Sequence, residues 1–323
     1  MIAGLISLEV IPMCSAPESN WRAWWPSRAD EIAADARRRL AAAVDGWRLR
    51  DLEPMLGGEV ALVFAVAAPD GDAVLKVNPR VAGATDELAQ EGHALELWAG
   101  QGIGPRVLGA RDDGLTLLLQ RIRPGHNLRD TGADARQIMR TLGGLCPRIH
   151  LVAEPGRFCP LGEGSEATSW RHALAGTREL AELERLLTPS REDRLLHTDL
   201  HWLNALRGPR GWTVIDPKPH VGDPHADVFA FFDGPPLSAM PDGRRAAREH
   251  MRSLTELYAR TAGLDRDRVE AWIRIRALAI AGESDGCDGS DGSDGSDGSD
   301  GQAESHPGRA WHEQLLRLAD AVV

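Results

Sequence analysis

The stretch Leu195–Phe232 holds side chains whose types and spacing could do chemistry. It contains one carboxylate in a polar loop, Asp199, and a second, Asp216, at the end of an apolar run, with the amide of Asn204 between them. Carboxylate and amide oxygens are ligands for hard divalent cations, and a remaining carboxylate can act as a general base. The stretch therefore predicts a site that combines a divalent cation with a base.

A short hairpin is expected to bring two of these groups together. Gly208–Gly211, with the sequence Gly-Pro-Arg-Gly, is typical of a turn, and Thr213–Ile215 supplies β-forming side chains after it. Counting outward from the turn places Asn204 opposite Asp216 or the residue before it. An amide and a carboxylate would then meet at one end of a hairpin, beside the polar loop.

The part of the chain before this stretch is predicted to form an antiparallel sheet. Apolar runs alternate with turn signals across residues 49–77, and residues 105–120 hold two more strands. Gly57 and Gly58 join the first two strands. Backbone amides at such a pair can approach a phosphate closely, although an ordinary hairpin turn would use the same residues.

Lys76 lies in this sheet and has a candidate partner on the next helix. It interrupts the apolar run Ala73–Val77, and the apolar stripe of the helix predicted at Asp86–Trp98 includes Glu91. A carboxylate on a buried helix face needs a partner. We therefore expect a Lys76–Glu91 ion pair that presents the ammonium to nucleotide phosphates; a solvated Glu91 at the edge of the stripe is the alternative.

The order of elements predicts two lobes after an N-terminal extension. We expect residues 1–44 to form the extension with a helix capped by Ser27, residues 45–120 a β-rich lobe, and residues 121–323 a helical lobe that carries the predicted cation-and-base site. A Ser-Asp-Gly repeat at residues 284–301 cannot bury a core and is predicted to be a disordered insertion. The helices of the second lobe are expected at residues 133–152, 166–187, 244–262, 266–281 and 309–321.

The composition excludes several classes of partner. The net charge of -11 over 323 residues argues against nucleic-acid and anionic-membrane surfaces, which need clustered cations. The four cysteines are scattered, which indicates neither a disulfide framework nor a zinc site, and no apolar run approaches the roughly 20 residues that span a bilayer. We expect a cytoplasmic protein, a monomer or weak dimer, whose acidic balance suits a cationic small molecule.

The joint order of these parts matches the machinery of phosphoryl transfer. HTDLHWLN at His197–Asn204, followed by VIDPKP at Val214–Pro219, resembles the aminoglycoside phosphotransferase family. The runs LKV, LWAG, GWTVIDPKP and VGDPHADV are similar to its streptomycin 6-phosphotransferase and hydroxyurea phosphotransferase branch. Over residues 45–280 the resemblance implies an α+β, two-lobed protein-kinase-like fold. Its N-terminal lobe would hold an antiparallel sheet with one key helix, and its larger C-terminal lobe would be mostly helical.

The resemblance also implies roles in the catalytic stretch. Asp199 would be the catalytic base, and Asn204 and Asp216 would bind Mg²⁺. His197 and Asp227 would brace the loop that carries the base.

In the N-terminal lobe the resemblance implies an ATP site. Lys76 would contact the phosphates, Glu91 would orient Lys76, and the loop with Gly57 and Gly58 would cover the phosphates. Lys218 could neutralise the transferred phosphate, although a structural pairing is an equal alternative. The hinge that meets adenine through backbone groups would comprise Gln120, Arg121 and Ile122.

Two departures from the family pattern bear on the substrate. Thr198 replaces the small residue usual between the histidine and the aspartate, and Trp202-Leu203 replaces the familiar Pro-Gly before Asn204. The bulky Trp202 could reshape the acceptor pocket. The first candidate reaction is phosphorylation of streptomycin at its 6-hydroxyl, and hydroxyurea or another small hydroxyl compound is the alternative within the family.

Two interpretations from other classes remain open. A nucleotide-binding pseudokinase would bind ATP without turnover, because the departures touch the catalytic loop. A metal-dependent hydrolase would use imidazole ligands, which transition metals favour, but would leave the lysine, glutamate and asparagine described above without roles. The ligands of that metal would be drawn from His197, Asp199, His201, His220, His225 and Asp227.

Overall fold

The computed structural model describes residues 15–55, 60–81, 85–285 and 307–322. Gly57, Gly58 and the Ser-Asp-Gly repeat beyond Asp285 therefore lie outside the described residues. The chain divides into two compact units: Met1–His126 with Leu206–Pro219, and Asn127–Ala205 with His220–Val323. The first unit thus takes in a segment that the sequence assigns to the helical lobe.

That returning segment contains the predicted hairpin. β7 (Ala205–Gly208) and β8 (Gly211–Val214) form a two-stranded sheet, and because both glycines belong to strands the turn is shorter than expected. Asn204 precedes β7 and belongs to the second unit, whereas Asp216 follows β8 and belongs to the first. The strands end before these two residues, so the hairpin ladder does not pair them.

Backbone hydrogen bonds anchor this hairpin to the first unit, which is the physical reason for the difference in boundary. They carry Asp216 with the sheet rather than with the helices. The bonds run from Gly125 N to Arg207 O at 3.0 Å, from Arg207 N to His126 O at 2.7 Å and from Val214 N to Ile103 O at 2.7 Å.

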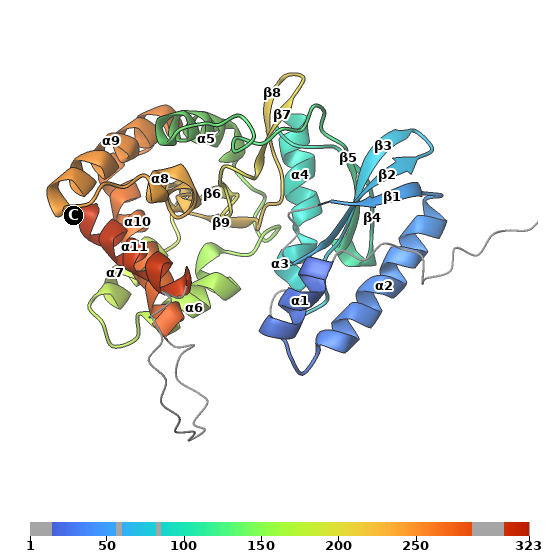
Figure 1. The fold of residues 1–323 in the computed structure, drawn as a ribbon, viewed down its shortest axis with the longest axis horizontal. Coiled ribbons are helices and arrows are strands. Elements are labelled where there is room, and N and C mark those ends of the chain that lie inside the picture. The colour runs from blue at the N-terminus through green and yellow to red at the C-terminus, as the bar shows by residue number, and fades with distance from the viewer. Residues whose placement is uncertain (1–14, 56–59, 82–84, 286–306, 323) are drawn as a thin grey trace, which may run out of the picture. The chain divides into compact units, whose positions relative to one another are not determined.

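The first unit is built on a five-stranded antiparallel sheet in the order β1-β2-β3-β5-β4 (Figure 1). β3 is central, and Lys76 on it pairs in register with Val63 of β2 and Leu117 of β5. A lysine at the centre of a sheet is held on both sides by backbone ladders, which fixes the direction of its side chain. The strands are β1 (Arg50–Pro54), β2 (Leu62–Ala68), β3 (Gly71–Val77), β4 (Val107–Arg111) and β5 (Thr116–Gln120).

Two N-terminal helices, α1 (Ser15–Trp24) and α2 (Ala29–Gly46), contribute to the core of this unit. Trp21 is fully buried, and its indole Nε1 donates to Val60 O at 2.8 Å. The expected cap at Ser27 is wrong: the N-cap residue of α2 is Arg28, and it makes no side-chain capping bond. Acidic residues in the first turn of α2 favour that end of the helix instead.

The single helix predicted after the sheet's third strand is two helices, α3 (Thr85–Ala89) and α4 (Glu91–Gly100). The break falls at Gln90, directly before Glu91. Glu91 therefore begins α4 and is buried, as are Leu95 and Trp98 on the same helix.

The second unit is mostly helical around the two-stranded sheet β6 (Arg194–Leu196) and β9 (His220–Gly222). In Figure 1, α5 (green) lies beside α9 (orange), and at their contact a Cβ on Gly143 would come within 2.9 Å of Tyr258 O. The helix predicted at 166–187 is interrupted near Gly176, whose φ is +79°. The helices are α5 (Ala135–Ile149), α6 (Ser165–Ala173), α7 (Glu179–Leu186), α8 (Pro235–Ser238), α9 (Arg244–Ala262), α10 (Arg266–Asp285) and α11 (Pro307–Ala321).

Within the described part of the chain, every helix is too short or too polar to cross a membrane.

Candidate active site

A buried ion cluster lies in the first unit, at Lys76. Its Nζ is 2.7 Å from Oε2 of Glu91, and Oδ1 of Asp216 contacts the same ammonium. The side chains of Lys76 and Glu91 are almost completely buried, whereas that of Asp216 is 48% exposed. The ion pair expected from the helix stripe is therefore present, and the hairpin adds a second carboxylate to it.

The charges of this cluster support one another against the cost of burial. Burial alone would lower the pKa of Lys76, but the carboxylates of Asp216 and Glu91 raise that pKa above its usual value. Burial raises the pKa of Glu91, and the contact with Lys76 opposes this. Asn78 Nδ2 donates to Glu91 Oε2 at 3.1 Å, and Arg39 in turn donates to Asn78 O at 2.7 Å. The ammonium is held charged at a fixed place next to a half-exposed carboxylate.

A second buried carboxylate, Asp227, shapes the loop that follows β6 in the other unit. Its Oδ2 accepts from His197 N at 2.9 Å and its Oδ1 from Thr198 N at 2.6 Å. His150 Nε2 lies 3.0 Å from Oδ2, and the hydroxyl of Tyr258 donates to the backbone oxygen of Asp227. Burial alone would raise the pKa of Asp227, but the hydrogen bond from His150 holds it below its usual value. The bracing contact expected of Asp227 is thus visible in the geometry.

Thr198 needs that bracing, because its backbone is in the left-handed region with φ +54°. A β-branched residue in this region costs on the order of 1–3 kcal/mol and persists only where its surroundings enforce it. Thr198 is also almost fully buried. The two charge-assisted bonds to Asp227 supply the constraint, so the threonine that departs from the family pattern is accommodated without opening the loop.

Asp199 and Asn204 lie on this braced loop. Asn204 is buried and its Nδ2 donates to the backbone oxygen of Asp199 at 2.9 Å. The amide nitrogen is thereby engaged with the loop, and the side-chain oxygen is the atom suited to a cation. The side chain of Asp199 is 14% exposed. The loop thus presents a carboxylate and an amide oxygen from one short turn.

The remaining predicted site residues lie near the end of β5 and after β8. Gln120, at the end of β5, exchanges hydrogen bonds with Arg106: its backbone N donates to Arg106 O at 2.8 Å, and its side chain accepts from Arg106 N at 3.3 Å. Arg121 and Ile122 follow β5 directly. Lys218 is exposed.

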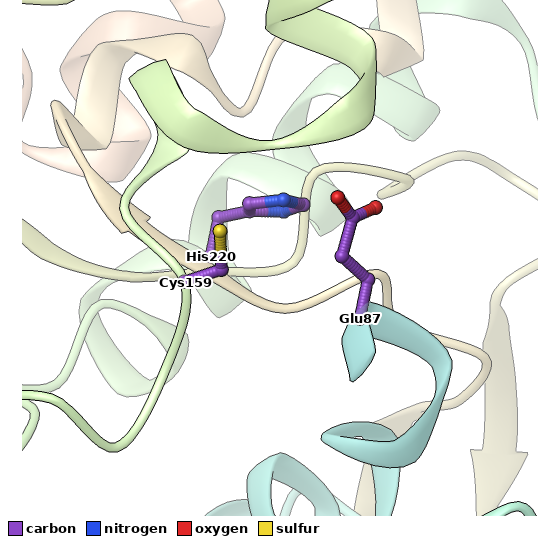
Figure 2. A group of neighbouring side chains, drawn as sticks. All are labelled: Glu87, Cys159 and His220. Carbon is purple, nitrogen blue, oxygen red and sulfur yellow. The ribbon is translucent and has the colours of Figure 1, made fainter. Parts of the chain in front are cut away.

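The metal cluster considered from sequence is not supported. Within the described residues, side chains that lie close enough together to share one metal ion do not include His197, Asp199 or His201. His220 has its ring pressed against Gly164, where an added Cβ would be 2.4 Å from Nε2. Figure 2 shows this ring next to Cys159, whose backbone oxygen accepts from the N–H of the residue after His220. We interpret His220 as a packing residue of β9.

Sequence reasoning missed the role of Asp223. Its carboxylate caps the short helix Pro224–Ala226 by accepting from His225 N at 3.1 Å, and it also accepts from Arg268 Nε and Trp272 Nε1, each at 2.6 Å. Burial alone would raise its pKa, but the hydrogen bonds from His225 and Trp272 lower the pKa of Asp223 to about 2. Asp before Pro at a helix start was an available capping signal. The partners on α10 could not be read from sequence.

The family is decided by comparison with known proteins. The model of the aminoglycoside/hydroxyurea antibiotic resistance kinases matches residues 46–287. This chain belongs to that family. A hydroxyurea phosphotransferase from Kitasatospora aureofaciens is 36% identical over 72% of this chain and 68% of its own length, and a streptomycin 6-kinase from Streptomyces griseus is 32% identical over 74% and 80%. This antibiotic resistance kinase is accordingly a phosphotransferase that acts on a small molecule.

Solved structures confirm the fold class expected of this kinase. An amicoumacin kinase in complex with AMP-PNP, Ca²⁺ and Ami has a TM-score of 0.60 at 15% identity, covering 90% of this chain and 95% of that one. A choline/ethanolamine kinase family protein from Mesorhizobium loti has a TM-score of 0.53 at 16% identity, covering 90% and 94%. The kinase-like fold, with a sheet lobe followed by a helical remainder, is therefore shown.

Proposed function

We propose that this kinase transfers the γ-phosphoryl group of ATP to the 6-hydroxyl of streptomycin, with Mg²⁺ as the metal. The observation that carries the proposal is the buried ammonium of Lys76, held by Glu91 and Asp216 within one unit. A fixed cation beside a half-exposed carboxylate suits a nucleotide phosphate and its metal. The relatives that phosphorylate streptomycin support the choice of acceptor.

The two proposed magnesium ligands each carry a suitable donor atom. Asp216 contacts Lys76 through Oδ1 and is 48% exposed, and Asn204 directs its nitrogen to the backbone, so each can offer a hard oxygen. A magnesium ion held by these oxygens would offset the negative charge that develops during phosphoryl transfer. The ammonium of Lys76 offsets further phosphate charge, and Glu91 fixes where it does so.

Asp199 is the proposed base. It orients the acceptor hydroxyl and takes its proton as the new oxygen–phosphorus bond forms and the bond to the leaving ADP oxygen breaks. His197 and Asp227 hold the loop so that this carboxylate stays in place. The proposal also includes an adenine hinge at Gln120, Arg121 and Ile122. A loop with Gly57 and Gly58 would cover the phosphates, and Lys218 would contact the transferred phosphate.

Hydroxyurea is the second candidate acceptor. It is favoured by one observation, the higher identity to the hydroxyurea phosphotransferase. Hydroxyurea carries a single hydroxyl on a very small neutral molecule, whereas streptomycin is large and cationic. The two acceptors therefore make opposite demands on the size and charge of the acceptor pocket, and one assay separates them.

The test is a comparison of acceptors with the purified protein and Mg-ATP. Streptomycin, hydroxyurea and an aminoglycoside that lacks the streptidine ring are offered in turn, with ADP release and the mass of the product as readouts. We expect turnover with streptomycin and a product phosphorylated on streptidine. Turnover with hydroxyurea and with neither of the other two compounds would show that hydroxyurea, and not streptomycin, is the acceptor. ATP binding without turnover on any of them would favour the pseudokinase and overturn the proposal.

The role of Asp199 is tested by Asp199→Asn, which keeps the shape of the side chain and removes its basicity. We expect turnover to fall by about 10²-fold to 10⁴-fold, the usual contribution of a general base, while ATP affinity stays near that of the parent. Undiminished turnover in this variant would show that another group accepts the proton.

A further inference from the structure

The imidazole of His201 lies between two carboxylates of the second unit. Its Nε2 is 4.0 Å from Oδ1 of Asp199, and its Nδ1 is 3.4 Å from Oδ2 of Asp233. The side chains of His201 and Asp199 are each 14% exposed, and that of Asp233 is 43% exposed. A ring whose two nitrogens face two acidic groups can transmit the position of one to the other.

Asp233 is itself held in place. Trp202 Nε1 donates to Oδ2 of Asp233 at 2.9 Å. The imidazole of His201, 3.4 Å away, lowers the pKa of Asp233 below its usual value, and the hydrogen bond from Trp202 adds to this effect. Asp233 is therefore a stable anion at the outer end of the arrangement, and the residue next to His201 fixes it.

The next residue along the chain completes this anchor. Gly234 has φ +67°, and a Cβ there would come within 2.6 Å of the Trp202 ring. The indole therefore lies flat against a position where any other residue would collide with it. Trp202 is thus engaged with Asp233 through its N–H and with Gly234 through its ring.

Aromatic packing fixes the plane of the His201 ring from another direction. Its centroid is 5.5 Å from that of Phe229 at a tilt of 56°, and Phe229 packs edge-on against Phe232 at 6.1 Å. With one nitrogen near Asp233 and one face near Phe229, the ring has little freedom to turn away from Asp199.

We propose that His201 is a positioning residue for the catalytic base: Asp233, anchored by Trp202, orients the imidazole, and its Nε2 side orients the carboxylate of Asp199. This inference rests on the proposed function, because it takes Asp199 as the base. The 4.0 Å contact between Nε2 and Oδ1 is within ion-pair range. Asp199 then keeps its other oxygen directed to the acceptor hydroxyl.

Three substitutions of His201 separate this role from packing. His201→Phe keeps a ring against Phe229 and removes both nitrogens. His201→Gln places an amide near the position of Nε2, and His201→Asn places one near the position of Nδ1. We expect Phe and Asn to lower kcat by about tenfold to a hundredfold, the usual cost of losing an orienting partner, and Gln to recover part of the loss.

A purely structural role of His201 would change the KM values or the melting temperature, so both are measured as well. We expect the KM values for ATP and for the acceptor to stay within about twofold in all three variants, and the melting temperature within a few degrees. His172→Phe is the matched control, because His172 is exposed on α6, and it should keep the parental kcat.

A double-mutant cycle tests the route through Asp233. Asp233→Asn alone should lower kcat, and combining it with His201→Phe should cost no more than His201→Phe alone, because Asp233 acts through the ring. Trp202→Phe, which keeps the packing on Gly234 and removes the indole N–H, should give a smaller loss of the same kind.

Several results would overturn the inference. One is a parental kcat in His201→Phe, and another is an equal loss of kcat in His201→Gln and His201→Asn. Additive losses in the double-mutant cycle, or a loss of activity explained by raised KM values or by unfolding, would also contradict it. Asp199→Asn distinguishes this from failure of the proposed function. If Asp199→Asn is inactive while His201→Phe is fully active, only the inference fails; if Asp199→Asn is fully active, the proposed base itself is wrong.

Discussion

The buried clusters around Lys76 and around Asp227 use carboxylates in opposite ways. In the first unit, Glu91 and Asp216 hold the ammonium of Lys76, so that side chains pair with side chains. In the second unit, the carboxylate of Asp227 holds two consecutive backbone N–H groups and one imidazole. The first cluster places a charge, whereas the second places a segment of backbone.

The two clusters should therefore respond differently when one of their carboxylates changes partner. An ion pair with a half-exposed member can exchange partners when a ligand arrives, because the exposed carboxylate has access to water and metal. A carboxylate that is completely buried and holds main-chain donors cannot leave without stranding them. We therefore expect substitutions in the first cluster to act mainly on catalysis and those in the second mainly on folding.

The largest expected effect breaks the first cluster. Lys76→Met removes the ammonium, and we expect kcat/KM for ATP to fall about a thousandfold, which corresponds to about 4 kcal/mol of transition-state binding. The variant also leaves Glu91 buried without its cation, so its stability falls as well. Adding Glu91→Gln should restore much of the unfolding free energy and none of the activity. If the double variant regained ATP turnover, the cluster would not be placing a charge.

The next effect breaks the second cluster. Asp227→Asn lets only one side-chain atom accept where two oxygens did, and we expect the free energy of unfolding in urea to fall by about 3 kcal/mol. Asp242, whose side chain is fully exposed, supplies the control: Asp242→Asn should stay within about 0.5 kcal/mol of the parent. A near-parental Asp227→Asn would mean that the loop after β6 is held by other contacts.

A pH series sharpens the comparison, because Asp227 should lose its contribution to stability in acid and Lys76 in alkali. The pKa of Asp227 is lowered in the folded protein, so its contribution to stability is present above the unfolded value of about 4 and is lost as pH falls below it. The pKa of Lys76 is raised, so its contribution is present below about 10.4 and is lost as pH rises through the folded value. Melting temperatures measured across pH for the parent, Asp227→Asn and Lys76→Met check this.

In that series the difference from the parent should shrink below about pH 4 for Asp227→Asn and should begin to shrink only above about pH 10.4 for Lys76→Met. Asp223, with a pKa of about 2, contributes acid sensitivity to every variant and cancels in these differences. Parallel curves at all pH values would contradict the assignment of the two charges.

The smallest expected effect concerns Thr198. Thr198→Gly relieves the left-handed backbone but loses the contacts of a buried side chain, and we expect the unfolding free energy to change by less than about 1 kcal/mol. Thr198→Val, which keeps the β-branch, serves as the comparison and should be the less stable of the two. A large loss in Thr198→Gly would show that the side chain, and not the bond to Asp227, holds the loop.

The sequence predicted the elements whose signals are local. The strands of the first unit, the buried Glu91 and its pairing with Lys76 followed from periodicity and from the cost of burying a carboxylate. The hairpin followed from its glycines and proline. In each of these cases the determining residues lie close in sequence or repeat with the period of the element.

What escaped prediction depends on contacts made by distant residues. The second carboxylate on Lys76 comes from a residue 140 positions away and is not visible to local propensity. The break at Gln90 and the start of α2 after Arg28 also escaped prediction. Asp233 beside His201, and Arg268 and Trp272 beside Asp223, lie on segments that sequence spacing cannot place. The family resemblance supplied the expected brace at Asp227, whereas His150 and Tyr258, which complete it, had no signal of their own.

The contact between Trp202 and Gly234 has a consequence for engineering this kinase. Replacing Trp202-Leu203 by the more usual Pro-Gly would leave Asp233 without its indole donor and a hole beside the glycine. Grafting a catalytic loop from a relative therefore requires the segment around Asp233 to move with it. The loop with Trp202 and the segment around Asp233 should be exchanged together, and chimeras that take them from different parents should be less active than either parent.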